Sequence, residues 1–254
     1  MKKLVFRILC NEFTGKVISW VFQNNIPNCR YDFKRFKTPE RYCSNTIRAM
    51  IFWGFYERAE MRLIAGNLDP CLPVIELGAS LGIVSTKMIS RLNRDVHYTC
   101  IEANPYLIEY IRHNVETHNS AASFSVDNVA IAYTDNDWVE MQITPNNTQG
   151  RIAYDNQVNN YASVLKVKAS TLTGYAKSPY TLISDIEGME IEVFKNDAGA
   201  LKNCRHLFIE LHKTWYNGKC YEIGELEEII INDLGFEAVR RDGNVFYFAK
   251  PANS

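Results

Sequence analysis

Short apolar runs alternate with amphipathic segments along the chain after residue 71. The apolar runs predict β-strands and cover residues 74–77, 96–102, 123–126, 180–185 and 206–212. The segments after them space their apolar positions as helices do and cover residues 83–92, 105–118, 189–201 and 221–234. This alternation predicts an α/β fold in which a mostly parallel sheet carries helices on both faces.

The end of the chain predicts a different strand arrangement. Residues 236–239 and 245–248 are apolar and flank Arg241-Asp242-Gly243-Asn244. An Asp-Gly pair between two such runs favours a tight turn. We therefore expect a C-terminal antiparallel hairpin at one edge of the sheet.

An excursion interrupts the alternation at about residues 137–168. Residues 138–143 and 163–168 alternate apolar and polar side chains, as half-exposed antiparallel strands do. The loop between them, residues 145–160, is rich in Asn and Gln. A loop of this length in a compact domain is usually functional or disordered, so we expect a mobile substrate lid or a simple surface loop.

Residues 1–70 show helical periodicity, most clearly from Asn45 to Asn67, and no alternating strand pattern. We expect a helical N-terminal cap over residues 1–70 and the α/β domain over residues 71–254. The aromatic residues at 52–56 could line a pocket, but aromatic residues at helical spacing are more often core.

Composition narrows the class of protein. The chain has 254 residues and a net charge of -1, which argues against nucleic acid as an obligatory partner. Its seven cysteines form no C-x-x-C pair and are expected to be buried thiols in a reducing compartment. The apolar run at residues 4–10 is interrupted by Arg7 and is too short for a secretory signal or a membrane span. A cytoplasmic protein is therefore expected.

The loop Glu76-Leu77-Gly78-Ala79-Ser80-Leu81-Gly82 joins the first strand to its helix. Its glycines allow a sharp turn and close approach of a ligand, and the helix N-terminus suits a carboxylate or a phosphate. A dinucleotide-binding loop requires G-x-G-x-x-G, and Ser80 stands where the middle glycine would be. The spacing therefore disfavours a pyrophosphate ligand.

Carboxylates end or follow successive strands: they are Glu76, Glu102, Asp127 and Asp185. Ligands of parallel sheets bind at the carboxyl ends of the strands, so these side chains are candidates for one site. Glu102 is placed to accept hydrogen bonds from both hydroxyls of a ribose. Ala103 offers an apolar wall for adenine, and Asp127 with Asn128 could bind the adenine amino group.

With these residues assembled, the sequence resembles the FkbM family of methyltransferases that depend on S-adenosylmethionine (SAM). The loop at 76–82 is similar to the family's D-V-G-A-N-x-G, and residues 101–105 are similar to F-E-P-N-P. The most specific match is Asp185-Ile186-Glu187-Gly188-Met189-Glu190 against D-V-E-G-A-E, and Ile209-Glu210-Leu211-His212 resembles I-E-x-H. The resemblance covers about residues 54–248 and departs from the family pattern at Glu76 for Asp, Ser80 for Asn and Ser184 for Lys.

The resemblance implies the class I SAM-methyltransferase fold, which is Rossmann-like and has a seven-stranded sheet. It also implies SAM as methyl donor and transfer to a hydroxyl of a sugar, glycan or small metabolite. The candidate cofactor-binding residues are Glu76, Gly78, Ala79, Ser80, Gly82, Glu102, Ala103, Asp127, Asn128 and Asp185.

The candidate catalytic residues are His212, Asp185 and Glu187. His212 is the hypothetical general base, because a reference pKa near 6.5 suits proton transfer at neutral pH. A histidine held by Glu210 for structural reasons is an equal alternative. Asp185 and Glu187 are expected to orient substrate hydroxyls. A divalent cation held by these acids together with Glu210 or His212 is less favoured, because acids at i and i+2 are common without a metal.

Two other functions remain as alternatives. One is a non-catalytic interaction module with a SAM-type fold, and intact Gly78, Gly82, Glu102 and Asp185 argue against it. The other is a nicotinamide-dependent dehydrogenase, which the loop spacing and the terminal hairpin disfavour. No motif indicates the acceptor or the oligomeric state.

Overall fold

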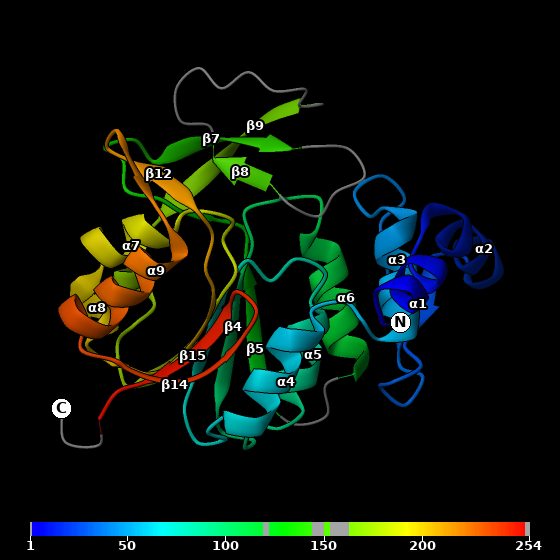
Figure 1. Cartoon of the computed structure of the whole chain (residues 1–254), viewed down its shortest axis with the longest axis horizontal. Helices are drawn as coiled ribbons and strands as arrows, with labels where there is room; N and C mark the ends of the chain where they lie inside the picture. The colour runs from blue at the N-terminus through cyan, green and yellow to red at the C-terminus, as the bar shows by residue number, and fades with distance from the viewer. Residues whose placement is uncertain (1, 119–121, 144–149, 153–162, 252–254) are drawn as a thin grey trace.

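A computed structural model describes residues 2–118, 122–143, 150–152 and 163–251. The chain folds around a seven-stranded sheet of order β14-β15-β11-β10-β3-β4-β5 (Figure 1). Its strands are β3 (Val74–Leu77), β4 (His97–Ile101), β5 (Ser123–Asp127), β10 (Tyr180–Ser184), β11 (Cys204–Glu210), β14 (Glu237–Asp242) and β15 (Val245–Ala249). The first five run parallel, and β15 lies antiparallel between β11 and β14. This topology confirms the predicted Rossmann-like fold with its C-terminal hairpin.

Helices cover both faces of the sheet (Figure 1). One face carries α4 (Arg58–Asn67), α5 (Ile83–Ile89) and α6 (Ile108–His118), and the other carries α7 (Glu190–Asn196), α8 (Ala198–Leu201) and α9 (Ile223–Glu228). Side chains alternate between the faces along each strand. Val74 and Tyr98 therefore pack in one core, whereas Ile75 and Ile101 pack in the other.

Two predicted helices are each divided into two shorter helices in the structure. The helix expected at 45–67 is α3 (Asn45–Trp53) followed by α4, because Gly54 ends α3 in the left-handed region at φ +66°. The helix expected at 189–201 divides into α7 and α8 at Asp197, whose carboxylate accepts hydrogen bonds from the backbone N–H groups of Leu172 and Thr173. After α9, the chain forms a short π-helical turn at Ile229–Asp233.

The segment before the sheet contains α1 (Lys2–Leu9), α2 (Glu12–Phe22), β1 (Asn25–Pro27), β2 (Arg35–Lys37), α3 and α4. β1 and β2 form an antiparallel ladder that periodicity did not predict, because three-residue strands are too short to show alternation. Ile26 and Phe36 are fully buried and join the core on the α4 face. The division of the chain at residue 70 stays a prediction.

A smaller sheet of order β6-β9-β7-β8 lies beyond the carboxyl ends of the central strands (Figure 1). Its strands are β6 (Ala130–Ile131), β7 (Trp138–Ile143), β8 (Gly150–Ile152) and β9 (Ser163–Ser170). β7 and β9 pair antiparallel, as the alternation at 138–143 and 163–168 predicted. Most of the expected lid at 145–160 lies outside the described residues. Smaller elements are a 3-10 turn (Leu172–Gly174) and a hairpin of β12 (Thr214–Tyr216) and β13 (Lys219–Tyr221).

All seven cysteines are free thiols, and Cys71 is exposed although burial was expected. Within the described ranges, no helix is both long and apolar enough to cross a bilayer.

Glu76 is a carboxyl group buried inside the central sheet. It lies in β3 and accepts hydrogen bonds from the Ser85 hydroxyl and from the Tyr98 hydroxyl, the latter at 3.0 Å. Burial raises the pKa of Glu76 from 4.5 to about 7, although these two hydrogen bonds oppose the rise. The folded protein therefore holds a proton there that the unfolded chain releases above pH 4.5.

We expect this proton to make stability depend on pH. The contribution of Glu76 falls as pH rises from 4.5 through about 7, by up to about 3 kcal/mol, because the unfolded chain ionises first. In Glu76→Gln this contribution is absent. Urea unfolding at pH 5 and pH 8 should therefore show that the free energy of unfolding of the variant, relative to the wild type, is higher at pH 8 than at pH 5. Replacing the exposed Glu116 by Gln is the control, and a pH-independent difference for Glu76→Gln contradicts the prediction.

Candidate active site

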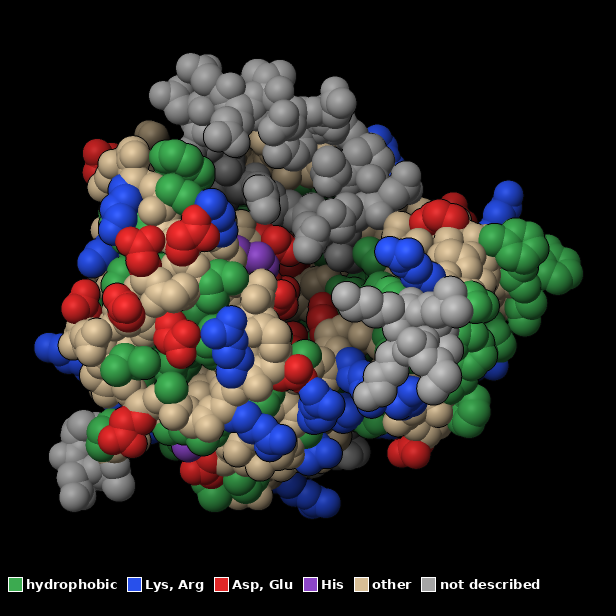
Figure 2. Space-filling view, in the orientation of Figure 1, with side chains coloured by type: hydrophobic (Ala, Val, Ile, Leu, Met, Phe, Trp, Pro, Cys, Tyr) green, Lys and Arg blue, Asp and Glu red, His purple; other side chains and the backbone are tan. Residues whose placement is uncertain are grey.

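A cavity of about 420 Å³ opens at the carboxyl ends of β3, β4, β10 and β11. It is lined by Ile47, Met50, Tyr56, Glu57, Leu77, Gly78, Ser80, Ile101, Glu102, Ala103, Val129, Ala130, Ile131, Met141, Asp185, Ile186, Glu187, Met189 and Glu210. Five of these described residues are acidic and none is Lys or Arg. Figure 2 shows acidic side chains inside the central hollow. The cavity is therefore built for a ligand that carries positive charge or many hydrogen-bond donors.

The predicted loop after β3 forms one wall of the cavity. Gly78 has φ +82°, and a Cβ there would lie 1.9 Å from the carbonyl oxygen of Asp185. The Ser80 N–H donates to Glu102 Oε2 at 2.8 Å, and the Ser80 hydroxyl lies 3.0 Å from the hydroxyl of Tyr56. The loop thus joins β3 to the ends of β4 and β10 and to the N-terminal segment.

Glu102 is the buried acid at the end of β4. Its Oε1 accepts from the N–H of Asn104 at 2.7 Å, and its Oε2 accepts from Ser80. Burial raises the pKa of Glu102 to about 7, and the backbone hydrogen bonds limit the rise. Both oxygens are held in place but each keeps acceptor capacity toward the cavity.

The Asp185–Glu190 segment turns sharply beside the cavity. Glu187 and Gly188 have φ +52° and +103°, and Glu187 reaches the cavity wall. The Gly188 N–H donates to Glu190 Oε1 at 3.1 Å, and the Thr214 hydroxyl donates to the Gly188 carbonyl. Two successive left-handed residues need this support, because a non-glycine residue at φ > 0 is strained.

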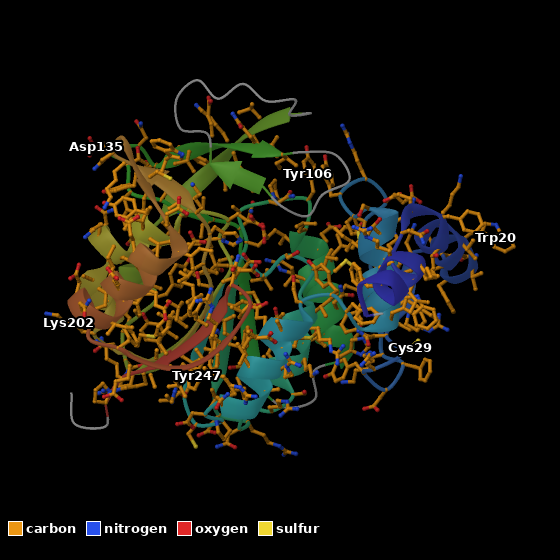
Figure 3. The ribbon with its side chains drawn as sticks, viewed as in Figure 1. Trp20, Cys29, Tyr106, Asp135, Lys202 and Tyr247 are labelled. Carbon is orange, nitrogen blue, oxygen red and sulfur yellow. The ribbon has the colours of Figure 1, made fainter. Side chains whose placement is uncertain are left out.

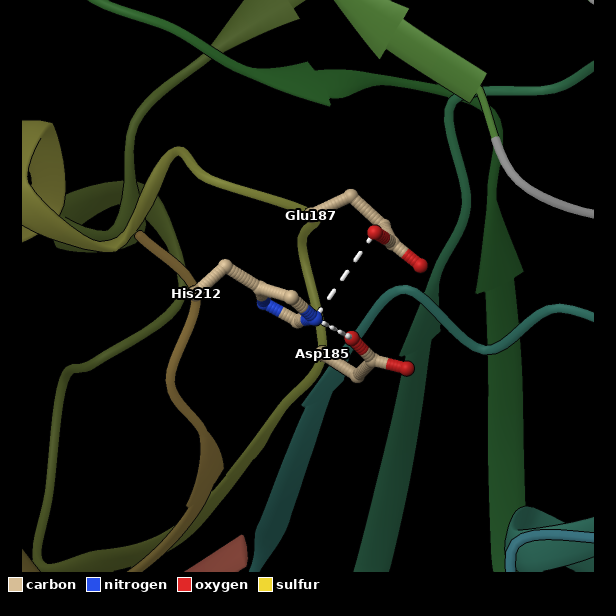
Figure 4. Close-up of side chains that lie close together, drawn as sticks. All are labelled: Asp185, Glu187 and His212. Carbon is tan, nitrogen blue, oxygen red and sulfur yellow. Dashed lines mark ion pairs between the residues drawn. The ribbon is translucent and has the colours of Figure 1, made fainter. Parts of the chain in front are cut away.

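The ring of His212 points toward the carboxylates of Asp185 and Glu187 (Figure 4). Its Nδ1 is 2.8 Å from Oε1 of the fully buried Glu190. Its Nε2 is 3.9 Å from Asp185 Oδ1 and 3.7 Å from Glu187 Oε2. The Glu190 hydrogen bond fixes the ring so that Nε2 faces the acids of the cavity.

The charges of this cluster shift one another. Burial alone would lower the pKa of His212, but the hydrogen bond to Glu190 and the charges of Glu190, Glu187 and Asp185 outweigh it and raise the pKa to about 9. Burial and the charges of Glu187 and Glu210 raise the pKa of Asp185 to about 8, against the opposing charge of His212. The cluster therefore holds protons at neutral pH.

Asp185, Glu187 and His212 also place one ligand atom each within 4.8 Å of one another, and Asp185 Oδ1 is buried without a hydrogen-bond partner. Two carboxylate oxygens and an imidazole nitrogen suit a divalent cation. The same atoms suit shared protons, which require no ion.

The predicted site residues fall into two groups. The cavity receives Gly78, Ser80, Glu102, Ala103, Asp185 and Glu187. The lining does not include Glu76, Ala79, Gly82, Asp127, Asn128 or His212. The Asn128 amide donates to the carbonyl oxygens of Glu102 and Ala103, at 2.9 and 3.0 Å, so it braces the β4 end. Gly82 lies against Ile111 of α6.

Residues of the N-terminal segment complete the cavity. The possibility that the aromatic residues at 52–56 line a pocket included Tyr56, whereas Glu57 was not predicted. Tyr56 and Glu57 line it from the link between α3 and α4. Burial raises the pKa of Glu57 well above its usual value, and the nearby charges of Asp185, Glu76 and Glu210 add to the rise. The signal for Glu57 in the sequence is its place directly after the aromatic residues at 52–56, for which a core position was favoured over a pocket.

Several solved structures are similar to this chain. A magnesium protoporphyrin IX methyltransferase from Synechocystis with bound SAM has 11% identity and a TM-score of 0.41, with 76% of each chain covered. A putative RNA methyltransferase from Pyrococcus horikoshii has 11% identity and a TM-score of 0.42, over 94% of this chain and 98% of that one. A putative tRNA methyltransferase from Streptococcus pneumoniae in complex with SAM has 13% identity and a TM-score of 0.39, over 75% and 71%.

These structures correct one expectation. The expectation from net charge that nucleic acid is not a partner does not stand: the similar structures include methyltransferases described as a putative RNA and a putative tRNA enzyme. Net charge is a sum over the chain and does not report local charge.

Sequence comparison gives the family. No curated protein matches the chain. The model of the methyltransferase FkbM domain, however, matches residues 76–238, which include the β3 loop, Glu102, the Asp185–Glu190 turn and His212. Because this match spans well over half of the chain, the protein belongs to the FkbM methyltransferase family.

Proposed function

We propose that this protein is a SAM-dependent O-methyltransferase acting on a hydroxyl of a sugar, glycan or small metabolite. The observation that carries the proposal is the cavity beside the β3 loop, which has five acidic lining residues and no Lys or Arg among the described ones. SAM carries a sulfonium and an ammonium group, so acids without competing cations favour it. The same lining disfavours a pyrophosphate.

The residues present fit this methyl donor. Glu102 offers carboxylate oxygens to ribose hydroxyls, and Ala103 with Ile131 offers apolar surface to adenine. Asp185 lines the cavity, and its carboxylate would accept a hydrogen bond from an ammonium group. SAM, when bound, supplies an electrophilic methyl group.

The chain's own residues have to position the hydroxyl and remove its proton. In the proposal, Glu187 orients the hydroxyl from the cavity wall. His212 in its neutral form accepts the proton at Nε2, and Glu190 stabilises the resulting imidazolium through Nδ1–H. His212 at neutral pH is mostly protonated, since its pKa is raised to about 9, so only a fraction of the enzyme is competent.

The first prediction concerns binding. In calorimetry, SAM should bind more weakly as pH falls below about 7, because the proton on Glu102 must be displaced. Glu102→Gln should weaken binding by about tenfold or more, since it removes a charged acceptor. Glu116→Gln is the control, and melting curves identify any collapse of the Ser80 loop. Unaltered binding by a folded Glu102→Gln protein would remove this residue from the proposal.

The second prediction concerns the rate. kcat/KM should rise roughly tenfold per pH unit up to about pH 9, because the neutral imidazole is the base. Glu190→Gln removes a charge that raises this pKa, so the inflection should move to lower pH by about one unit or more. Glu192→Gln on the same helix is the matched control. An unmoved inflection in Glu190→Gln, or loss of activity after exhaustive chelation, contradicts the proton-transfer role of this pair.

The acceptor class is tested by methyl incorporation. Purified protein with methyl-labelled SAM is offered glycans, sugar nucleotides, hydroxylated metabolites and bulk RNA. Label on a hydroxyl of the first three supports the proposal. Label on RNA alone overturns the acceptor class, and SAM binding without any turnover supports the interaction module.

A further inference from the structure

The N-terminal helix α2 carries a stripe of exposed apolar side chains. The stripe consists of Phe13, Val17, Trp20 and Val21, which lie at i, i+4, i+7 and i+8 and so share one side of the helix. Phe13 is 78% and Trp20 is 82% exposed. Figure 3 shows Trp20 at the outer edge of the molecule, pointing away from it. Contiguous exposed apolar surface of this kind marks an interaction site.

The stripe is exposed although α2 is firmly attached to the rest of the protein. The opposite side of α2 packs so closely on α3 that a Cβ at Gly15 would lie 1.7 Å from the carbonyl oxygen of Asn45. Glu12 accepts hydrogen bonds from the Asn45 amide at 3.1 Å and from the Thr46 hydroxyl at 2.9 Å. Rotating α2 to bury the stripe would break these contacts. The inner side is therefore fixed and the outer side is left apolar.

The corner between α1 and α2 is also fixed. The Asn11 side chain accepts from the N–H of Thr14 and donates to the carbonyl of Ile8. Ile8 is 61% exposed, and Arg7 beside it is exposed. α1 thus adds apolar and basic groups next to the start of α2.

Positive charge gathers in the same part of the chain. Residues 1–50 contain ten Lys and Arg against three Asp and Glu, whereas residues 51–254 contain 18 against 26. The first part therefore carries +7 and the second -8. Lys16 is exposed on α2, and the Arg35 guanidinium lies 5.7 Å from the ring of Phe22 at the end of this helix. An anionic partner is favoured.

We propose that the outer stripe of α2, with the basic groups around it, docks the protein onto the interface of an anionic lipid membrane. An apolar stripe with Trp and Phe, flanked by Lys and Arg, is the composition of helices that lie in the plane of a bilayer surface. Docking in this way needs no helix that crosses the membrane.

The other occupants fit less well. Pairing with a second copy through the stripe would bring the exposed Arg7 and Lys16 of the two copies close together, which costs energy. Nucleic acid would use the charge, but Val17, Val21 and Ile8 neither stack on bases nor form hydrogen bonds. An anionic bilayer uses both the charge and the aliphatic groups.

The experiment is co-sedimentation of the full chain with vesicles. Vesicles of phosphatidylglycerol and phosphatidylcholine should retain the protein, and pure phosphatidylcholine vesicles should retain roughly tenfold less. Trp20→Ser should lower retention on the anionic vesicles about tenfold or more, and Lys16→Glu should lower it severalfold and reduce its salt dependence. Trp215→Ser is the matched control, because Trp215 is 66% exposed in β12, away from α2.

The outcomes decide between the occupants. Selective loss in Trp20→Ser, with full retention of Trp215→Ser, supports the proposal. Absence of vesicle binding, or equal loss in both tryptophan variants, overturns it. If vesicles fail to bind, two further results would identify another occupant and overturn the proposal. One is concentration-dependent dimers that only Trp20→Ser abolishes, and the other is RNA retention that only Lys16→Glu abolishes. Circular dichroism confirms that each variant is folded.

Discussion

The structure depends on burying several carboxyl groups around one cavity whose described lining residues include no lysine or arginine to neutralise them. Glu57, Glu102 and Asp185 line the cavity, and burial raises the pKa of all three. Such groups stay protonated until something positive or rich in donors replaces the proton. The site is therefore incomplete by itself, and its free energy favours a cationic ligand. His212 lies 3.9 Å from one of these acids, Asp185, and Glu190 holds its ring in place.

Basic residues are distributed along the chain so that they stay away from the acidic cavity. Basic residues are concentrated before residue 51, in the helices and short strands that precede the central sheet. The α3 region and the link to α4 contribute Ile47, Met50, Tyr56 and Glu57 to the cavity lining, and none of these residues is cationic. Arg48 points elsewhere and donates to the carbonyl oxygens of Pro39 and Glu40. Positive charge is thus available for long-range attraction but kept away from the acids.

The sequence allowed the sheet to be predicted because each strand is an apolar run followed by a helix of clear period, and Glu102 and Asp185 followed from their place at strand ends. Glu76 was also a candidate for the site but does not line the cavity. Side chains alternate along β3, and the Glu76 carboxylate lies inside a core with Tyr98. The Asn128 amide donates hydrogen bonds to backbone carbonyl oxygens, and sequence spacing does not predict these bonds. Tyr56 and Glu57 reach the cavity through the left-handed turns at Gly54 and Glu57, so their role depends on tertiary structure that a helical period cannot show.

Gly78 has a consequence for how members of such a family are recognised. Its missing side chain makes room for the backbone of Asp185, and that of Gly82 makes room for α6, so protein rather than ligand occupies the space on that side. Selection for folding alone would keep both glycines in a descendant that had stopped performing chemistry. The presence of Gly78 and Gly82 therefore reflects the packing of the fold. The presence of both glycines in a sequence indicates this packing of the loop against its neighbours, and does not by itself indicate a bound ligand.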